Sequence, residues 1–168
     1  MAVGWEDRVV LSPHVGDLAA VEAQESLRQV AEALPRFLDR EPEIIAVDLH
    51  PDMPSTRLGE SLSEERALPL VRVQHHHAHA MACLAENGHV EGLALALDGT
   101  GLGADDSIWG AELLDVDASN YRRLASFAPA PLPGGDAAVL QPARQPLAEP
   151  LSADSDVPAH PHPALASA

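Results

Sequence analysis

The sequence contains no lysine, and all of its ten basic residues are arginine. A P-loop and Schiff-base chemistry both require a lysine, so both are excluded. The acidic residues number 26, which gives a formal net charge of −16 at pH 7. A chain this acidic is not drawn to nucleic acid or to an anionic membrane by its overall charge. We therefore expect neither of them as a partner.

Cysteine, aromatic residues and long apolar runs are also scarce. Cys83 is the single cysteine and has no internal disulfide partner, which suits a reducing compartment. Aromatic residues make up 3% of the chain and hydrophobic residues 46%, so a core must be built from alanine, leucine and valine. No apolar run reaches the ~20 residues that span a bilayer, and the N-terminus lacks a signal-peptide pattern. We expect a cytoplasmic protein of about one domain.

Apolar periodicity predicts a mixed α/β fold. Residues 17–38 have apolar positions at helical steps, with Asp17 as a candidate cap and Pro35 as a kink or division near the end. Residues 55–67 are polar and predict a short helix or a loop. A further helix is expected to run from the histidine-rich segment to Asn87-Gly88. Strands are predicted at residues 8–12, 44–49, 69–74, 93–97, 107–117 and 121–130.

The composition changes after residue 128. Residues 129–168 hold most of the 15 prolines, and we expect residues 149–168 to be a disordered Pro/Ala-rich tail. His160 and His162 lie in this tail. Solvated side chains explain them better than a metal site does. Asp136, in "PLPGGDAA", is better explained by a turn than by a site.

Four histidines fall within the five residues "HHHAH", positions 75–79. On a helix His75 and His79 share one face, and two imidazoles one turn apart can ligate one divalent ion. His76 and His77 are expected to point elsewhere. The glutamate of a zinc-protease HExxH motif is absent, which argues against that class. A solvated or helix-capping histidine run remains the alternative.

Two residues follow on the same helix. Cys83 lies one turn after His79, and we interpret it as a small core residue rather than as a ligand. Glu86, near the helix end, is expected to face solvent.

The glycine-rich segment "DGTGLG", Asp98 to Gly103, follows an apolar strand. Glycines allow backbone N–H groups to approach an anion closely. Asp98 is placed where it can add a carboxylate oxygen to an ion held by the two histidines. A plain Asp-Gly turn residue is the alternative interpretation.

Two further polar features have a structural and a functional interpretation. "DLHPD", residues 48–52, marks either a cleft edge or a cap or turn. Arg57 is an anion-binding residue or, more often at such positions, a surface salt-bridge partner.

Four segments in register resemble the C-terminal region of HypF, the hydrogenase-maturation carbamoyltransferase family. They are "DLHPDMPSTR", "VQHHHAHAMACLAENG", "LALDGTGLGADDSIWGAELL" and "PLPGGDAA". The resemblance covers about residues 8–148. O-carbamoyltransferases and the tRNA threonylcarbamoyladenosine transferase family are more distantly similar.

The resemblance implies one ribonuclease H-like lobe of an actin-like ATPase fold over residues 1–148, with a mixed sheet and flanking helices. It also implies transfer of a carbamoyl group from carbamoyl phosphate, by way of a carbamoyl-adenylate, to the C-terminal cysteine of HypE. His75, His79 and Asp98 then fall on the family's metal-binding and catalytic positions. Gly99, Thr100 and Gly101 fall on its nucleotide-phosphate loop. The metal stays open among iron, zinc and manganese.

The chain also differs from the family in length. HypF proteins are several times longer than this sequence. We expect a truncated lobe whose missing part, including a further carboxylate to the metal, is supplied by another chain. A catalytically inactive metal-binding remnant or interaction module is the main alternative. An O-carbamoyltransferase fragment is another.

Overall fold

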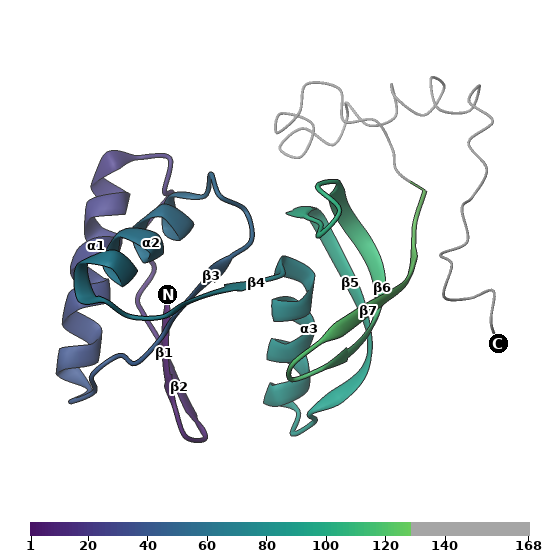
Figure 1. Ribbon diagram of the computed structural model, residues 1–168, viewed down its shortest axis with the longest axis horizontal. Coiled ribbons are helices and arrows are strands. Elements are labelled where there is room, and N and C mark those ends of the chain that lie inside the picture. Colours follow the sequence, from purple (N-terminus) through teal and green to yellow (C-terminus); the bar gives the residue numbers. More distant parts are fainter. Residues whose placement is uncertain (129–168) are drawn as a thin grey trace. The chain divides into compact units, whose positions relative to one another are not determined.

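The computed structural model describes residues 1–128 and confirms the mixed α/β fold (Figure 1). Its described residues divide into two compact units, one ending at His75 and one beginning at His76. The elements in chain order are β1 (Ala2–Trp5), β2 (Arg8–Leu11), α1 (Val21–Phe37), β3 (Ile45–Asp48), α2 (Pro54–Arg66), β4 (Leu70–Val73), α3 (His75–Glu86), β5 (Glu91–Leu102), β6 (Ile108–Asp117) and β7 (Tyr121–Ser126).

The first unit combines a hairpin with a β-α-β crossover. Strands β1 and β2 pair antiparallel, whereas β3 and β4 pair parallel through the crossover helix α2. Helix α2 approaches β3 closely at Gly59, where a Cβ atom would overlap the Val47 side chain. Parallel strands end at the same sheet edge, so the residues that follow β3 and β4 become neighbours.

Three details of the first unit differ from the sequence-based expectations. Strand β1 was not predicted, because its four residues carry no clear alternation. The Asp17 side chain accepts a hydrogen bond from the Ala19 N–H, ahead of the helix, and Ala20 is the N-cap. Helix α1 continues through Pro35 to Phe37, so of the two expected effects of this proline the division does not occur.

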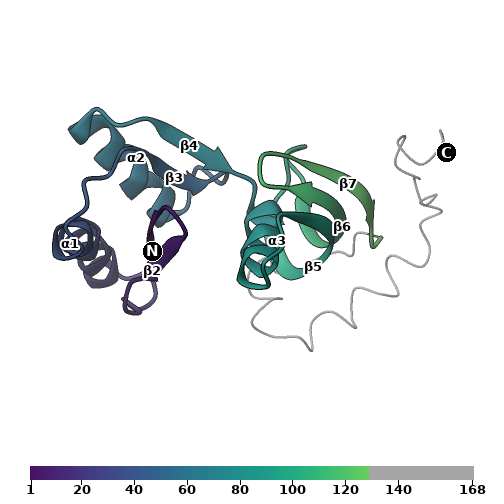
Figure 2. The ribbon, with the colours of Figure 1, turned by 90° about the horizontal axis from the view of Figure 1, so that it is seen from below.

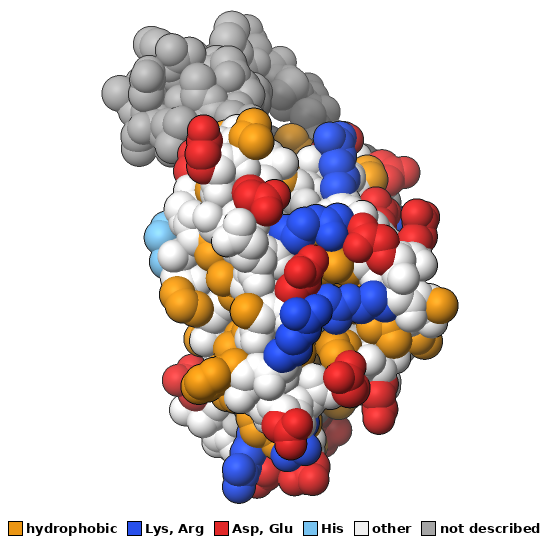
Figure 3. All heavy atoms as spheres, turned by 90° about the vertical axis from the view of Figure 1, so that its left-hand side faces the viewer, with side chains coloured by type: hydrophobic (Ala, Val, Ile, Leu, Met, Phe, Trp, Pro, Cys, Tyr) orange, Lys and Arg blue, Asp and Glu red, His pale blue; other side chains and the backbone are white. Residues whose placement is uncertain are grey.

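Basic and acidic side chains lie next to one another on the face of the molecule in Figure 3. Arg28 of α1 contacts Glu65 of α2 at 2.8 Å, and its hydrogen bond lowers the pKa of the Glu65 carboxyl to about 2. Arg57 contacts Asp52 at 2.6 Å, with both side chains mostly exposed. The salt-bridge interpretation of Arg57 is therefore confirmed.

The second unit consists of helix α3 and the antiparallel sheet β5-β6-β7 (Figure 2). Its buried hydrophobic core comprises Ala80, Trp109, Leu114 and Val116. Complete burial of a leucine such as Leu114 contributes roughly 1.5–3 kcal/mol. From Glu91 to Gly99, every second residue of β5 is exposed. Among these residues, Leu93, Leu95 and Leu97 have 57% to 69% of their surface accessible.

The glycine-rich segment does not form the turn that the sequence suggested. Strand β5 continues through it to Leu102, and the pairing register with β6 shifts between Leu97 and Gly101. The reversal comes later, between β5 and β6. The predicted turn is thus a bulge inside a long strand, a feature that glycine favours because it lacks a side chain.

The expectations about the domain and about the chain after residue 128 are not tested by these elements. The single HypF-like partial domain over residues 1–148 stays a prediction. The tail over 149–168, Asp136, His160 and His162 lie outside the described residues. Among residues 1–128, no helix has the length and apolar character to cross a bilayer.

Candidate metal site

Helix α3 carries the histidine cluster, and its sequence explains its limits. Alanine, the best helix former, recurs along it. It ends at Glu86 and is followed by Gly88, whose φ is 75°. The His89 N–H donates to the Leu84 carbonyl and the Gly88 N–H to the Ala85 carbonyl. This pairing is a Schellman motif, for which glycine is the preferred residue. The predicted stop at Asn87-Gly88 is confirmed.

Three of the predicted site residues come together. His75, His79 and Asp98 each offer one ligand atom, and these atoms lie within 4.8 Å of one another. His79 Nε2 is 4.0 Å from Asp98 Oδ2, and the His79 side chain is 61% exposed. Two imidazole nitrogens and one carboxylate oxygen are a donor set that suits zinc, iron or manganese. The residues therefore fit a divalent ion, whose binding stays a prediction.

His76 does not point away from the cluster as expected. It is fully buried, its Nε2 lies 3.9 Å from Asp98 Oδ2, and its ring centroid is 5.8 Å from that of Trp109. A residue next to a ligand on a helix is rotated by about 100° from it, so helical spacing alone could not reveal this position. His77 does point elsewhere, and its Nε2–H donates to the Asp117 carbonyl at 2.8 Å.

Asp98 is presented by the β5 bulge. Three residues of β5, from Asp98 to Thr100, face the single residue Gly110 of β6. A Cβ atom on Gly110 would lie 3.0 Å from the Asp98 carbonyl oxygen. The Asp98 Oδ1 accepts a hydrogen bond from the Gly99 N–H at 2.7 Å. A side chain at position 110 would therefore require the Asp98 carbonyl to move by a few tenths of an ångström.

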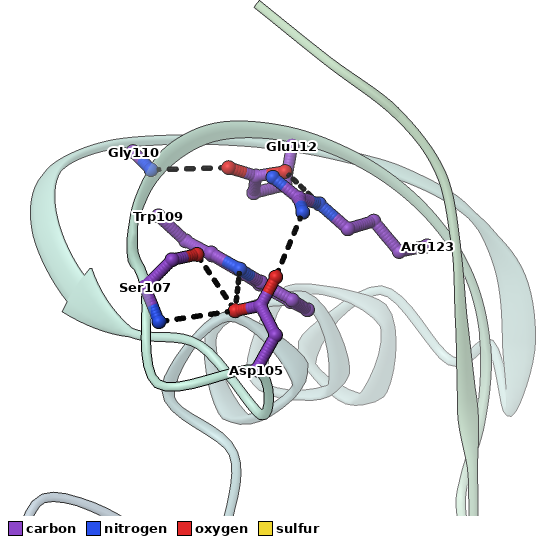
Figure 4. Close-up of polar contacts among 6 residues, drawn as sticks. All are labelled: Asp105, Ser107, Trp109, Gly110, Glu112 and Arg123. Carbon is purple, nitrogen blue, oxygen red and sulfur yellow. Dashed lines mark hydrogen bonds and ion pairs between the residues drawn. The ribbon is translucent and has the colours of Figure 1, made fainter. Parts of the chain in front are cut away.

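A polar network lies beside this bulge (Figure 4). Glu112 is 2% exposed and accepts hydrogen bonds from the Gly110 N–H at 3.2 Å and from Arg123 Nε at 2.6 Å. Arg123 also lies over the Trp109 ring, 4.3 Å from its centroid. The buried carboxylate is therefore both charge-paired and hydrogen-bonded, as a buried charge requires.

Asp105 joins the network from the turn between β5 and β6. It accepts hydrogen bonds from the Ser107 hydroxyl at 2.7 Å, the Ser107 N–H at 3.2 Å and the Trp109 indole at 2.9 Å. These bonds, led by the one from the Ser107 hydroxyl, hold the pKa of Asp105 below its ordinary value. They also connect the turn to the strand that supports Asp98.

The remaining predicted residues are distributed around the bulge. Gly99 and Thr100 lie within it, and Gly101 is the buried residue at which its strand pairing with β6 resumes.

A groove of about 390 Å³ has His79, Cys83, Leu95 and Asp98 among its lining residues. Cys83 is exposed, so its interpretation as a core residue was wrong. Glu86 is exposed, as expected.

Comparison with known proteins decides the family. The "HypF Kae1-like domain" matches residues 1–86. The chain belongs to this HypF family. The "Carbamoyltransferase, Kae1-like Domain, second subdomain" matches residues 94–162. The boundary between these two matches lies near the division between the two units of the described HypF chain.

Relatives of this HypF family member are named carbamoyltransferases. It is 47% identical over 139 residues to Carbamoyltransferase HypF2 of Cupriavidus necator, covering 82% of this chain and 17% of that protein. It is 40% identical over 146 residues to Carbamoyltransferase HypF of Rhodobacter capsulatus, covering 83% of this chain and 20% of that protein. The chain thus spans about a fifth of the length of these relatives.

A solved structure extends the likeness to the fold. The crystal structure of full-length HypF in the phosphate- and nucleotide-bound form matches with a TM-score of 0.71 and 36% identity. The match covers 78% of this chain and 17% of that one. The predicted resemblance to the C-terminal region of HypF is confirmed.

Proposed function

We propose that this chain forms part of a carbamoyltransferase of [NiFe]-hydrogenase maturation. The group transferred is the carbamoyl group of carbamoyl phosphate, which passes through a carbamoyl-adenylate to the C-terminal cysteine of a HypE-like acceptor. The observation that carries the proposal is the convergence of His75, His79 and Asp98 within 4.8 Å. It occurs in a chain that is 47% identical over 139 residues to a protein named a carbamoyltransferase.

The site residues have separate roles in this proposal. His75, His79 and Asp98 hold a divalent ion of zinc, iron or manganese. When bound, the ion supplies positive charge beside phosphate oxygens and polarises the carbamoyl carbonyl. Residues 99–101 line the phosphate site, because a glycine-rich backbone lets phosphate groups approach closely. The acceptor thiolate forms a bond to the carbamoyl carbon, the bond to the adenylate phosphate oxygen breaks, and AMP leaves.

A nucleotide is a reasonable second ligand for this site. The similar solved structure is a phosphate- and nucleotide-bound form of HypF. The ligand belongs to that protein, and the 36% identity of the two chains supports carrying the ligand class to this chain. An O-carbamoyltransferase would use the same donor chemistry with a hydroxyl acceptor, and the acceptor distinguishes the two activities.

The proposed enzyme requires more protein than this sequence contains. The chain spans 17% to 20% of the length of its relatives from C. necator and R. capsulatus. Leu93, Leu95 and Leu97 expose an apolar row on β5, and exposed apolar patches mark contact surfaces. We expect another chain or a further segment to supply the rest of the nucleotide site.

Metal binding by the chain is the first test. Zn²⁺ titration followed by calorimetry is expected to give one site in the wild-type chain. His75→Ala and Asp98→Ala should each weaken it, because each removes one of three ligands. His89→Ala is the matched control, since His89 is exposed and lies outside the ligand group. Equal Zn²⁺ affinities of the wild type and all three variants would refute the site.

Activity requires a second test, which also separates an enzyme from a metal-binding module. The matching 139-residue segment of the C. necator protein is replaced by the corresponding part of this chain. The chimera is expected to carbamoylate a HypE-like acceptor in the presence of carbamoyl phosphate and ATP, detected by intact mass. The same chimera with His79→Ala should lose this activity. A folded, metal-binding chimera without activity would favour the module.

A further inference from the structure

His75 has a neighbour within the first unit, Asp48 of the "DLHPD" segment. Asp48 is the last residue of β3, and it pairs in register with Val73, the last residue of β4. His75 follows two residues later as the first residue of α3. Both side chains therefore start from the same edge of a parallel strand pair, where polar side chains converge.

The contact between these residues is short and partly shielded. His75 Nδ1 lies 2.7 Å from Asp48 Oδ2. The Asp48 side chain is 17% exposed and the His75 side chain 23%. The other carboxylate oxygen, Asp48 Oδ1, accepts the backbone N–H of His50 at 2.9 Å. The carboxylate is thus fixed at both oxygens, and its orientation toward His75 is set by the backbone after β3.

This geometry determines which imidazole nitrogen carries the proton. An ionised carboxylate only accepts hydrogen bonds, so His75 Nδ1 must donate. A neutral imidazole has one N–H, which leaves the lone pair on Nε2, the nitrogen able to bind a metal. Carboxylates commonly act this way behind metal-bound histidines, where they fix the tautomer, orient the ring and raise its basicity.

We propose that Asp48 is a positioning residue of the metal site, which holds His75 as the Nδ1–H tautomer with Nε2 directed to the ion. The inference rests on the proposed metal site for its functional meaning, but the tautomer of His75 is a property of the metal-free chain. Under this proposal the "DLHPD" segment contributes to the metal site through Asp48, in addition to forming a turn.

The test compares two aspartates of the same segment. Asp48→Asn retains the shape of the side chain and an oxygen for the His50 N–H, but its amide no longer requires His75 Nδ1 to donate. Asp52→Asn removes an identical charge from an exposed residue that contacts Arg57. Loss of a second-shell carboxylate typically weakens metal affinity by about 10- to 100-fold. We expect that loss of Zn²⁺ affinity for Asp48→Asn and no loss for Asp52→Asn, measured calorimetrically on the full chain.

A second readout is independent of metal. Nitrogen-15 NMR of the metal-free wild-type chain is expected to show His75 as the Nδ1–H tautomer, and Asp48→Asn should shift it toward Nε2–H. An Nε2–H tautomer in the wild type would overturn the inference, as would equal Zn²⁺ affinities of the two variants. If the wild type binds no Zn²⁺, the proposed function fails, while the NMR result still decides the role of Asp48. Far-UV circular dichroism of each variant verifies that the fold is retained.

Discussion

Two adjacent arginines of β7 provide a sharp test of the structure of the second unit. Arg123 pairs with Glu112 at 2.6 Å, and their side chains are 21% and 3% exposed. Arg122 pairs with Asp115 at 2.9 Å, with side chains that are 60% and 45% exposed. The two pairs differ in burial, and Arg123 also lies over the Trp109 ring and 3.4 Å from Asp105. Replacing each arginine by methionine removes the same charge from a buried and from an exposed pair.

The expected magnitudes differ several-fold. Removing one partner of a buried ion pair costs about 3–5 kcal/mol, because the other charge is left buried. Arg123 also loses its position over the Trp109 ring, which adds about 0.5–2 kcal/mol. An exposed pair contributes only about 0–1 kcal/mol. Since a domain is stable by about 5–15 kcal/mol, Arg123→Met should remove a large part of the unfolding free energy and Arg122→Met little of it.

Tryptophan fluorescence during urea unfolding measures the difference. Trp109 is 4% exposed, and the second tryptophan, Trp5, is replaced by phenylalanine in every variant so that the signal reports on one unit. Arg123→Met should lower the urea midpoint strongly, and Arg122→Met should leave it nearly unchanged. Equal shifts for the two variants would contradict the burial of the Glu112–Arg123 pair.

Three further predictions concern other parts of the chain. Gly110→Ala should cost about 1–3 kcal/mol by overpacking and weaken Zn²⁺ binding in calorimetry, because the added Cβ presses on the Asp98 carbonyl. An unchanged affinity would refute the support of the bulge by Gly110. Glu65, with its pKa lowered to about 2 by the hydrogen bond from Arg28, contributes stability above its ordinary pKa of 4.5 that is lost as pH falls toward 2. The difference in urea midpoint between wild type and Glu65→Gln should shrink over that range, and a constant difference would contradict the pairing. Exposed Cys83 should react fully with a thiol reagent without denaturant. Protection would instead support a core position.

Much of the fold could be predicted from local sequence signals. Helix α3 combines alanine-rich sequence with an Asn-Gly stop, and its C-terminal end lies where that stop places it. Asp98-Gly99 is a common turn dipeptide, so the sequence predicts a turn where the structure has a bulge in β5. Its extended course depends on pairing with β6, which local sequence does not encode.

The candidate site was predictable in part. Helical spacing placed His75 and His79 on one face, and the strand that follows α3 brought Asp98 to them. The position of His76 depends on how α3 is rotated over the sheet and on the Trp109 ring. The contact of Asp48 with His75 depends on the parallel pairing of β3 with β4. Both are tertiary effects that join segments distant in sequence.

The most direct test of the central claim is X-ray absorption spectroscopy of the Zn²⁺-loaded chain. Two imidazole ligands at about 2.0–2.1 Å and at least one oxygen ligand are expected in the wild type. The His79→Ala variant should show one imidazole, whereas His89→Ala should retain two. A zinc environment without imidazole, or one that is identical in wild type and His79→Ala, would contradict the assignment of His75, His79 and Asp98 to a single ion.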